Sequence, residues 1–301
     1  MRAFKKAAVA IAATITTAGV GAPAFANNDP GDYTPALAGQ SLLVLYNFTT
    51  LRDKLSTPTG DLSQGTHLDS NVTVIRPVHF IKIGPFVADP QFLLPVGWVG
   101  NGKVGGQRLN HTSGVGDITP AITLWVLNRP DPDRTRYFGL TVLITAPIGK
   151  YDYKKPVNLG GNRWVYDAQA GGIYGLNRHL LFDLTGDFIW YGRNDKFGID
   201  KQTLKQNMTV SFNSWLRYNI THGPTLSVGW NGTWGGRQFV DGSFNGTRTD
   251  HQQIQAAIQG AVGKSLLLEG LVGHDVQVRD GFRQNLVFEV RLLKIFGKGH
   301  I

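Results

Sequence analysis

The feature that most constrains this chain is a regular alternation of apolar and polar side chains. From Gly39 to the C-terminus, about a dozen segments of roughly ten residues carry it, and the gaps between them are alternately long and short. Residues at every second position share one face of a strand. Strands of this length, joined by alternating long loops and short turns, are typical of bacterial outer-membrane β-barrels. The predicted fold class is therefore all-β: a closed, antiparallel transmembrane barrel of about twelve strands.

Twelve strands are predicted from the positions at which the alternation starts and stops. Their ranges are 39–48, 72–83, 91–99, 116–126, 137–147, 163–175, 180–191, 207–219, 224–234, 251–262, 266–276 and 283–296. An even strand count returns both ends of the barrel to one side of the membrane. Because bacterial barrels keep their short turns in the periplasm, we expect both termini there.

The first 26 residues read as a leader. Arg2, Lys5 and Lys6 form a basic start, residues 7–20 are apolar and small, and Ala24-Phe25-Ala26 is an A-x-A cleavage site. This pattern predicts a secretory signal peptide over 1–26, which we exclude from the fold. The remaining chain divides into a periplasmic N-terminal segment, 27–38, and the barrel, 39–301.

Three observations favour a membrane barrel over a soluble β-sandwich. The strands are about 9–11 residues long, which is the length that crosses an outer membrane at a tilt. One face of many strands carries charge, which a packed soluble core rarely tolerates. Aromatic residues gather near strand ends, where interfacial girdles lie; they are Trp125, Trp164, Tyr166, Tyr174, Trp190, Tyr218, Trp230 and Trp234.

Several function classes find no support in the sequence. The chain has no cysteine, and its net charge of +9 is spread without a block of Lys or Arg, so neither thiol chemistry nor nucleic-acid binding is indicated. The histidines lack metal-ligand spacing, and neither a G-x-S-x-G elbow nor a complete P-loop is present. We therefore expect no catalytic residue, no cofactor and no metal.

The central third carries a specific series of motifs. It contains Gly114-Val115-Gly116-Asp117, Leu124-Trp125, Pro147-Ile148-Gly149-Lys150-Tyr151-Asp152 and Asn158-Leu159-Gly160-Gly161-Asn162-Arg163-Trp164. In order and spacing these motifs resemble the family called "MetA-pathway of phenol degradation", often labelled transporters. The resemblance implies an outer-membrane barrel that admits small solutes, hydrophobic or aromatic ones included.

Strand alternation places a set of charged residues on the polar, inward face. These predicted lumen-lining residues are Asp117, Asp167, Asp183, Asp187, Arg217, Glu269, Glu289 and Arg291. Two interpretations remain open. The charges line a passage and tune what crosses it, or they form an ion-pair network that fills a barrel narrower than a porin.

The motif around Asn158, Gly160, Asn162, Arg163 and Trp164 lies at the rim of the third long loop. This loop either folds inward and constricts the pore, or forms a local clasp with Trp164 as an interfacial anchor.

The segment 27–38 is a poor strand, because it contains Pro30, Gly31 and Pro35. One hypothesis is a plug that narrows the periplasmic mouth through Asp29, Asp32 and Tyr33, with the two acids pairing with Arg217 or Arg291. The alternative is a disordered tail.

The function predicted is passive uptake of small solutes across the outer membrane. Two alternatives stay open: a barrel enzyme of the lipase or phospholipase type, which would need a Ser, a His and a polar residue at one site, and a structural or adhesive barrel. The expected partners are outer-membrane lipids and lipopolysaccharide, the barrel-assembly machinery and the solute. Five residues follow Phe296, so the aromatic residue that assembly machinery commonly reads is not terminal here.

Overall fold

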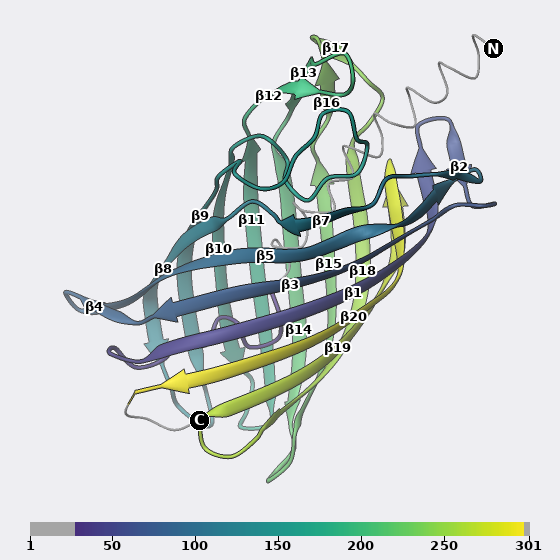
Figure 1. The fold of residues 1–301 in the computed structure, drawn as a ribbon. Helices are drawn as coiled ribbons and strands as arrows, with labels where there is room; N and C mark the ends of the chain where they lie inside the picture. The colour runs from purple at the N-terminus through teal and green to yellow at the C-terminus, as the bar shows by residue number, and fades with distance from the viewer. Residues whose placement is uncertain (1–27, 298–301) are drawn as a thin grey trace.

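A computed structural model shows twelve long antiparallel strands that form a barrel (Figure 1). It describes residues 28–297, so the predicted signal peptide, Asn27 and residues 298–301 lie outside the described residues. The twelve barrel strands are β1 (Ser41–Thr57), β3 (His67–His79), β5 (Phe86–Val104), β8 (Thr119–Arg129), β9 (Arg136–Thr145), β10 (Val165–Gly175), β11 (Leu180–Tyr191), β14 (Thr209–Asn219), β15 (Thr225–Gly235), β18 (Thr249–Ala261), β19 (Leu266–Arg279) and β20 (Gly281–Phe296). The predicted all-β barrel of twelve strands is confirmed.

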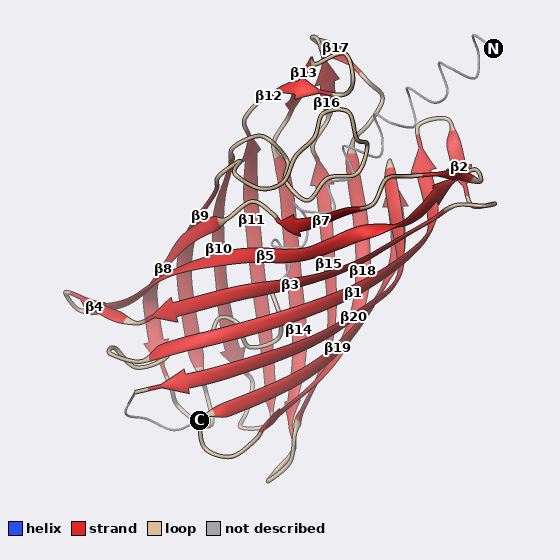
Figure 2. Cartoon of the chain, viewed as in Figure 1, coloured by secondary structure: helices blue, strands red, loops and turns tan. Residues whose placement is uncertain are grey.

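The barrel is closed by pairing between its first and last strands. β1 pairs with β3 on one side and with β20 on the other, and each remaining barrel strand pairs with its sequence neighbours. Closure satisfies the backbone N–H and C=O groups that lipid cannot hydrogen-bond. Residues 28–297 contain no helix long and apolar enough to cross a membrane (Figure 2).

The two ends of the barrel differ in the length of their connections. At one end lie the short turns at 176–179, 220–224 and 262–265, together with the start of β1 and the end of β20. The other end carries the longer connections and a separate small sheet. The short turns mark the periplasmic end, and we name the other the extracellular end.

The smaller strands are extensions of hairpins or parts of the extracellular connections. They are β2 (Gly60–Leu62), β4 (Ile81–Ile83), β6 (Gln107–Arg108), β7 (Thr112–Val115), β12 (Asn194–Phe197), β13 (Gln202–Gln206), β16 (Gln238–Val240) and β17 (Ser243–Phe244). The last four form the small sheet that rises above the extracellular rim (Figure 1).

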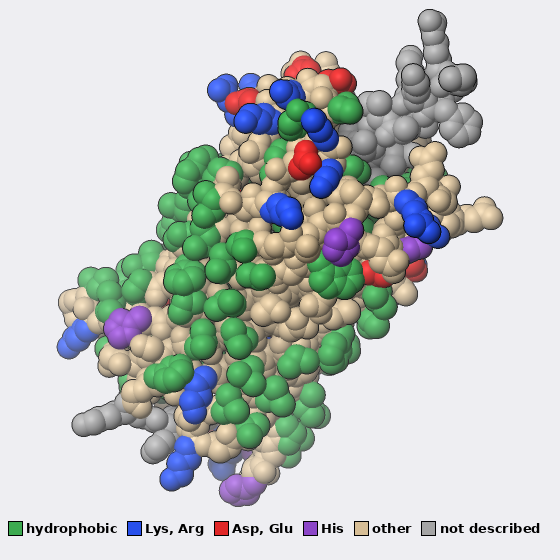
Figure 3. All heavy atoms as spheres, viewed as in Figure 1, with side chains coloured by type: hydrophobic (Ala, Val, Ile, Leu, Met, Phe, Trp, Pro, Cys, Tyr) green, Lys and Arg blue, Asp and Glu red, His purple; other side chains and the backbone are tan. Residues whose placement is uncertain are grey.

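The alternation of side chains becomes an apolar outside and a polar inside. On β11, Phe182, Leu184 and Phe188 are 40–49% exposed, whereas Asp183 and Asp187 are at most 6% exposed. Figure 3 shows hydrophobic side chains spread over the strands and charged ones mostly toward the two ends of the barrel. Because lipid penalises exposed charge, this register is the one that a membrane wall requires.

Several predicted strand ends were wrong, each for a local reason. β1 continues to Thr57, well past the predicted end at 48, because its hydrogen-bonded ladder extends as a hairpin through β2. β5 runs over Phe86–Val104 and includes most of the predicted turn 84–90; the reversal occurs earlier, at Gly84, whose φ is +58°.

The fourth predicted strand starts too early. β8 begins at Thr119, so Gly116 and Asp117 lie in the connection that joins β7 to β8 rather than on a strand face. Here the chain passes close to another loop: a Cβ on Gly149 would lie 2.3 Å from the carbonyl carbon of Gly116. Because Gly149 has no side chain, its backbone can lie against that of Gly116. Alternation of side chains along a strand does not predict such a contact between two loops.

Candidate functional site

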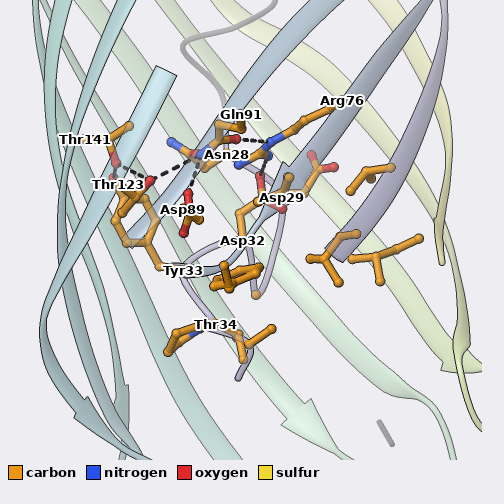
Figure 4. Close-up of a pocket in the computed structure, with 18 of the residues that line it drawn as sticks. Asn28, Asp29, Asp32, Tyr33, Thr34, Arg76, Asp89, Gln91, Thr123 and Thr141 are labelled. Atoms are coloured by element: carbon orange, nitrogen blue, oxygen red, sulfur yellow. Dashed lines mark hydrogen bonds and ion pairs between the residues drawn. The ribbon is translucent and has the colours of Figure 1, made fainter. Parts of the chain in front are cut away.

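The candidate site lies in the lumen, and its first component is the N-terminal segment (residues 28–38). Figure 4 shows this segment inside the barrel. Its backbone makes a tight turn in which Asp32 N donates to the Asp29 carbonyl at 3.1 Å and Thr34 N donates to the Gly31 carbonyl at 3.0 Å. Gly31 takes a φ of +85°, which suits glycine at such a turn.

Hydrogen bonds attach this segment to the wall formed by β9, β10, β11 and β14. The indole N–H of Trp215 donates to the Asn28 carbonyl at 2.8 Å. Gly31 N donates to Asp183 Oδ2 at 2.8 Å. The Tyr33 hydroxyl donates to Gln169 Oε1 at 2.8 Å and lies 2.8 Å from Thr141 Oγ1.

Ion pairs attach the same segment to the opposite wall. Arg291 Nη1, on β20, lies 2.6 Å from Asp32 Oδ1 and 3.3 Å from Asp29 Oδ2. The other terminal nitrogen of Arg291 lies 2.8 Å from Glu269 Oε2, on β19. Arg76, on β3, reaches the second carboxylate oxygen of Asp32 at 3.2 Å. Two guanidinium groups from different strands therefore hold one short segment.

Burial strongly affects the segment's own titratable groups. The pKa of the Asp29 carboxyl is raised from 3.8 to about 6, chiefly because burial penalises its charge, while Arg291 opposes the shift. Burial also raises the pKa of the Tyr33 phenol, so this hydroxyl stays neutral and acts as a hydrogen-bond donor.

The remaining predicted lumen residues occupy three surroundings. Arg217, on β14, pairs with Asp183 on β11 at 2.8 Å. Asp187 accepts a hydrogen bond from Gln169, and Asp167, on β10, is half-buried with an oxygen that has no hydrogen-bond partner. Glu289, on β20, is buried beside Asp29.

A cavity of about 500 Å³ adjoins the N-terminal segment. Its wall is largely apolar and aromatic. The apolar and aromatic residues of this wall include Leu42, Val44, Tyr46, Phe48, Val74, Val78, Phe80, Leu93, Trp125, Leu143, Leu267, Leu293 and Ile295. They come mainly from β1, β3, β5 and β20, and β3, β5 and β20 also carry the charged cavity residues Arg76, Asp89 and Arg291.

The polar groups inside this cavity are bonded to one another. The Trp125 indole donates to Asp89 Oδ2 at 2.6 Å, and Gln91 Nε2 donates to Asp89 Oδ1 at 2.7 Å. Arg76 donates to Gln91 Oε1 and, at 2.8 Å, to the Tyr46 hydroxyl (Figure 4). Because these groups already have partners, the cavity offers a solute apolar contact more than hydrogen bonds.

The loop over 146–164 covers the extracellular end of the lumen. Val157 and Leu159 are buried in an apolar cluster, the extracellular cluster, whose other members come from β1, β3, β5 and β20: Leu55, Leu68, Val99, Val104 and Phe282. The Asn110 side chain donates to the Val157 carbonyl at 2.9 Å and accepts from the Val157 N–H at 3.1 Å. A loop that begins after β9 thus reaches across to the opposite wall.

Local bonds within the motif give this loop its shape. The Asn158 side chain bonds to backbone groups of Asp152 and Lys155. Gly160 N donates to the Lys150 carbonyl at 3.0 Å, and Asn162, with a φ of +52°, donates to Asn194 Oδ1 at 2.7 Å. The loop is therefore held in shape by hydrogen bonds from its own side chains, and it also covers the extracellular end of the lumen.

The two remaining motif residues face different surroundings. Arg163 is buried, lies over the Tyr191 ring at 4.6 Å and donates to Gln206 Oε1 at 2.6 Å. Burial lowers the pKa of its guanidinium, although the group stays charged. Trp164 is exposed on the outer surface, where its ring stacks with that of Tyr166 at 6.5 Å.

The side chain of Asp117 is hydrogen-bonded to the loop 146–164. Its two carboxylate oxygens accept hydrogen bonds from Gly149 N and Gly161 N, each at 2.7 Å. Burial raises its pKa, and these two bonds oppose the shift. Asp117 thus binds the start and the end of the loop, and the GxGD motif is explained by this contact rather than by a place on a strand.

Two side-chain pairs that each contain a histidine are relevant to the alternative that the barrel is an enzyme. Ser41 Oγ lies 2.8 Å from His79 Nδ1 at the periplasmic end. His251 Nε2 lies 2.7 Å from Asp275 Oδ1, near the extracellular end of β18 and β19. Within the described part of the chain, these pairs do not combine into one Ser–His–acid site.

Sequence reasoning missed the polar residues of the cavity. Arg76 is one of two charged residues in the predicted strand 72–83, the other being Lys82 near its end, and its place inside the strand is the signal that could have marked it. Asp89 falls in the gap between two predicted strands, and Gln91 and Tyr46 are not among the predicted lumen residues. The prediction that Trp125 belongs to an interfacial girdle was wrong, because its indole is 4% exposed and bonds to Asp89 inside the lumen. The connection among these residues depends on which strands face one another across the lumen, and strand alternation does not supply that information.

Comparison with known proteins decides the family. The sequence matches the family described as "Putative MetA-pathway of phenol degradation" over residues 52–292. The chain belongs to this family. Among the solved structures, the COG4313 outer membrane channel from Pseudomonas putida F1 is similar with a TM-score of 0.84 and 31% identity, covering 89% of this chain and 100% of that one.

Other barrels are much more distant. The transport unit of the autotransporter AIDA-I from Escherichia coli matches with a TM-score of 0.49 and 11% identity, over 95% of this chain and 98% of that one. The toluene transporter TbuX from Ralstonia pickettii matches with a TM-score of 0.48 and 7% identity, over 87% and 90%. Neither likeness carries weight for function. No curated protein matches the sequence.

Family membership and the closed barrel together establish the compartment. The apolar outer wall, the interfacial aromatic residues and the similarity to an outer-membrane channel identify this member of the phenol-degradation family as an outer-membrane protein of a Gram-negative bacterium.

Proposed function

We propose that this protein is a passive channel for small, uncharged, hydrophobic solutes, aromatic ones included. The observation that carries the proposal is the cavity of about 500 Å³ in the lumen, walled by apolar and aromatic side chains. A cavity of about 150 Å³ already holds benzene in another protein. The space is therefore sufficient for a substituted aromatic ring.

The cavity disfavours charged solutes. Moving an ionised group from water into an apolar site without a partner carries a large free-energy cost. The arginines that line the cavity, Arg76, Arg217 and Arg291, are already paired with carboxylates. A neutral hydrocarbon or phenol meets no such penalty, so the wall selects by polarity as well as by size.

We propose further that the N-terminal segment is a plug at the periplasmic side of this cavity. Support comes from its place inside the barrel and from its bonds to both walls through Asp32, Tyr33 and Gly31. Hydrogen bonds, ion pairs and the packing of Tyr33 against Trp125 hold the segment, but it is not part of the hydrogen-bonded ladder of the barrel, so its release costs less than unfolding of the barrel. Release of this segment would open the cavity toward the periplasm.

The loop 146–164 supplies the outer cover. Asp117 and the extracellular cluster hold it over the mouth. Entry of solute then requires a local opening of this loop, and exit requires movement of the N-terminal segment. A channel closed at both ends in this way admits solute slowly and without a continuous water-filled pore.

The same observations disfavour the two other readings of the barrel. An enzyme would need Ser41 or another nucleophile beside a histidine with an orienting acid, and the described pairs lie at opposite ends. An adhesive barrel would present larger outer domains than the small four-stranded sheet seen here. We infer that the protein is not an enzyme, and hydrolysis of labelled phospholipid by the purified protein would contradict this.

We also propose contacts outside the lumen with lipid, with lipopolysaccharide and with the barrel-assembly machinery. Stacked rings on the outer wall, such as Phe188 with Trp190 at 6.3 Å, suit the interface with lipid and lipopolysaccharide. The barrel-assembly machinery would recognise the last strand, β20, which ends at Phe296. No nucleic-acid partner is proposed.

Blocking the cavity tests the proposed function. Leu143 faces the cavity and is 8% exposed, whereas its neighbour Val142 faces outward and is 53% exposed. Leu143→Trp places a bulkier side chain in the cavity, and a loss of about 1–3 kcal/mol in solute binding would slow uptake of a radiolabelled aromatic hydrocarbon by about 5- to 150-fold. Val142→Trp is the matched control and should leave uptake unchanged. Equal uptake by both variants, with equal amounts of folded protein, would refute the proposal.

A further inference from the structure

Three carboxylates meet at the point where the N-terminal segment contacts β19 and β20. They belong to Asp29, Glu269 and Glu289, and we call them the carboxylate cluster. One oxygen from each lies within 4.8 Å of the others. They come from three separate parts of the chain, so the fold and not the local sequence brings them together.

The cluster is buried and short of partners. Glu269 and Glu289 are 1% and 2% exposed, and Asp29 is 7% exposed. Oε1 of Glu269 and Oε1 of Glu289 have no hydrogen-bond partner, whereas Oδ2 of Asp29 has the ion pair with Arg291 at 3.3 Å. Buried carboxylate oxygens are normally satisfied, so two unpartnered glutamate oxygens in one buried cluster point to a ligand.

The local charge points to the same conclusion. The carboxylate cluster and Asp32 carry four negative charges when ionised, and within residues 28–297 two guanidinium groups, those of Arg76 and Arg291, pair with them. Arg217 is matched by its own partner, Asp183, and does not change the balance. Two negative charges therefore remain uncompensated in a buried site, which is the charge that one divalent cation supplies.

We propose that the carboxylate cluster binds one divalent cation, best Ca²⁺, and that this ion fastens the N-terminal segment to the barrel wall. All donors are carboxylate oxygens, which hard cations prefer. Ca²⁺ takes six to eight oxygens in flexible geometry, so bidentate carboxylates and water can complete the set. Asp29 binds from the segment, and the two glutamates bind from β19 and β20.

Binding of the ion would make the position of the N-terminal segment depend on the concentration of the cation. Without it, Arg291 holds the segment while the cluster's carboxylates repel one another. With it, the repulsion becomes a bridge between Asp29 and both strands. The cation therefore stabilises the segment inside the barrel, and this holds whatever solute crosses the channel.

Calcium binding to the refolded mature protein tests the site. Refolding without lipopolysaccharide removes surface-bound ions, and equilibrium dialysis with ⁴⁵Ca²⁺ reads binding directly. We expect one ion per chain, with a dissociation constant of about 10⁻⁵–10⁻³ M, the range from sensor sites to extracellular modules. Calcium should also raise the melting temperature.

Conservative variants assign the ligands. Glu289→Gln removes one charge and keeps the shape, and should weaken calcium binding at least about tenfold. Glu269→Gln is the second variant if the first does not fold. Asp167→Asn is the matched control, because Asp167 is a lumen acid outside the cluster, and it should leave binding unchanged.

Two results would overturn the proposal. One is a folded wild-type protein that binds no calcium up to about 10 mM, above the range of known extracellular sites. The other is a Glu289→Gln variant that binds calcium as well as wild type or melts higher without calcium, which would show that the carboxylates share protons instead. Solute uptake is not the readout, so this failure and failure of the proposed channel remain distinguishable.

Discussion

Arg291 is the residue whose replacement should have the largest effect on the N-terminal segment. The Arg291→Met variant keeps an apolar side chain of similar length and removes the charge. In the wild type this guanidinium is 2% exposed and pairs with Asp32, Asp29 and Glu269. In the variant those carboxylates keep their burial and lose their nearest cation.

The expected cost follows from that geometry. Removal of one partner of a buried ion pair typically costs about 3–5 kcal/mol, because it leaves an uncompensated charge. The hydrogen-bonded ladder keeps the barrel wall folded in the variant. The free-energy cost therefore destabilises the state in which the N-terminal segment is bound in the lumen, relative to the released state. At about 1.4 kcal/mol per factor of ten, the released state should become about 10²- to 4 × 10³-fold more populated.

Single-channel recording in planar bilayers measures this population. Release of the segment should appear as a state of higher conductance, and Arg291→Met should increase the fraction of time spent in that state by the factor above. Arg193→Met is the control: Arg193 pairs with Asp195 on the exposed surface, where an ion pair is worth about 0–1 kcal/mol. A folded Arg291→Met channel with the wild-type open fraction would refute the reasoning.

Three further perturbations follow from the same contacts. Tyr33→Phe leaves Thr141 and Gln169 without their phenol partner, so we expect release about 5- to 150-fold more often, measured as open fraction. Asp117→Ala frees two backbone N–H groups of the loop 146–164, at about 2–3 kcal/mol, and trypsin should cleave after Lys154 at least tenfold faster than in wild type; an unchanged rate would count against the clasp. The pKa of Asp29 is about 6 in the folded protein against 3.8 ordinarily, so without calcium the segment should bind less tightly as pH rises from about 4 to 6, because only the bound segment retains the proton. Calcium affinity should show the opposite trend and fall as pH drops through about 6, because a protonated Asp29 is a poor ligand; a pH-independent affinity would exclude Asp29 as a ligand.

Strand positions were largely predictable from the sequence because lipid and lumen impose opposite polarity on alternate residues. The predicted range 180–191 coincides with β11, where five outward apolar positions alternate with polar ones. The predicted strand ends were wrong where a strand extends beyond the membrane, because lipid no longer imposes an apolar outer face there. β1 extends past the membrane as a hairpin, and there the hydrogen-bonded ladder continues without an apolar face.

The chemistry of the lumen was predictable only by residue type. Alternation places Arg291 and Glu269 on the inward face, but it does not say which groups meet across the barrel. The contact between Arg291 and Asp32 joins residues 259 positions apart. Asp89 and Arg76 were missed because their partners, Trp125 and Tyr46, come from other strands.

The central claim is that the cavity carries small uncharged hydrophobic solutes across the outer membrane. The most direct test compares uptake of a labelled aromatic hydrocarbon with uptake of an aromatic carboxylate of the same size, in cells that express this chain as their only added channel. The account predicts that expression accelerates entry of the neutral solute, that Leu143→Trp reduces this gain about 5- to 150-fold, and that the carboxylate enters no faster than in cells without the channel. Faster entry of the carboxylate, or no gain for the neutral solute, would contradict the account.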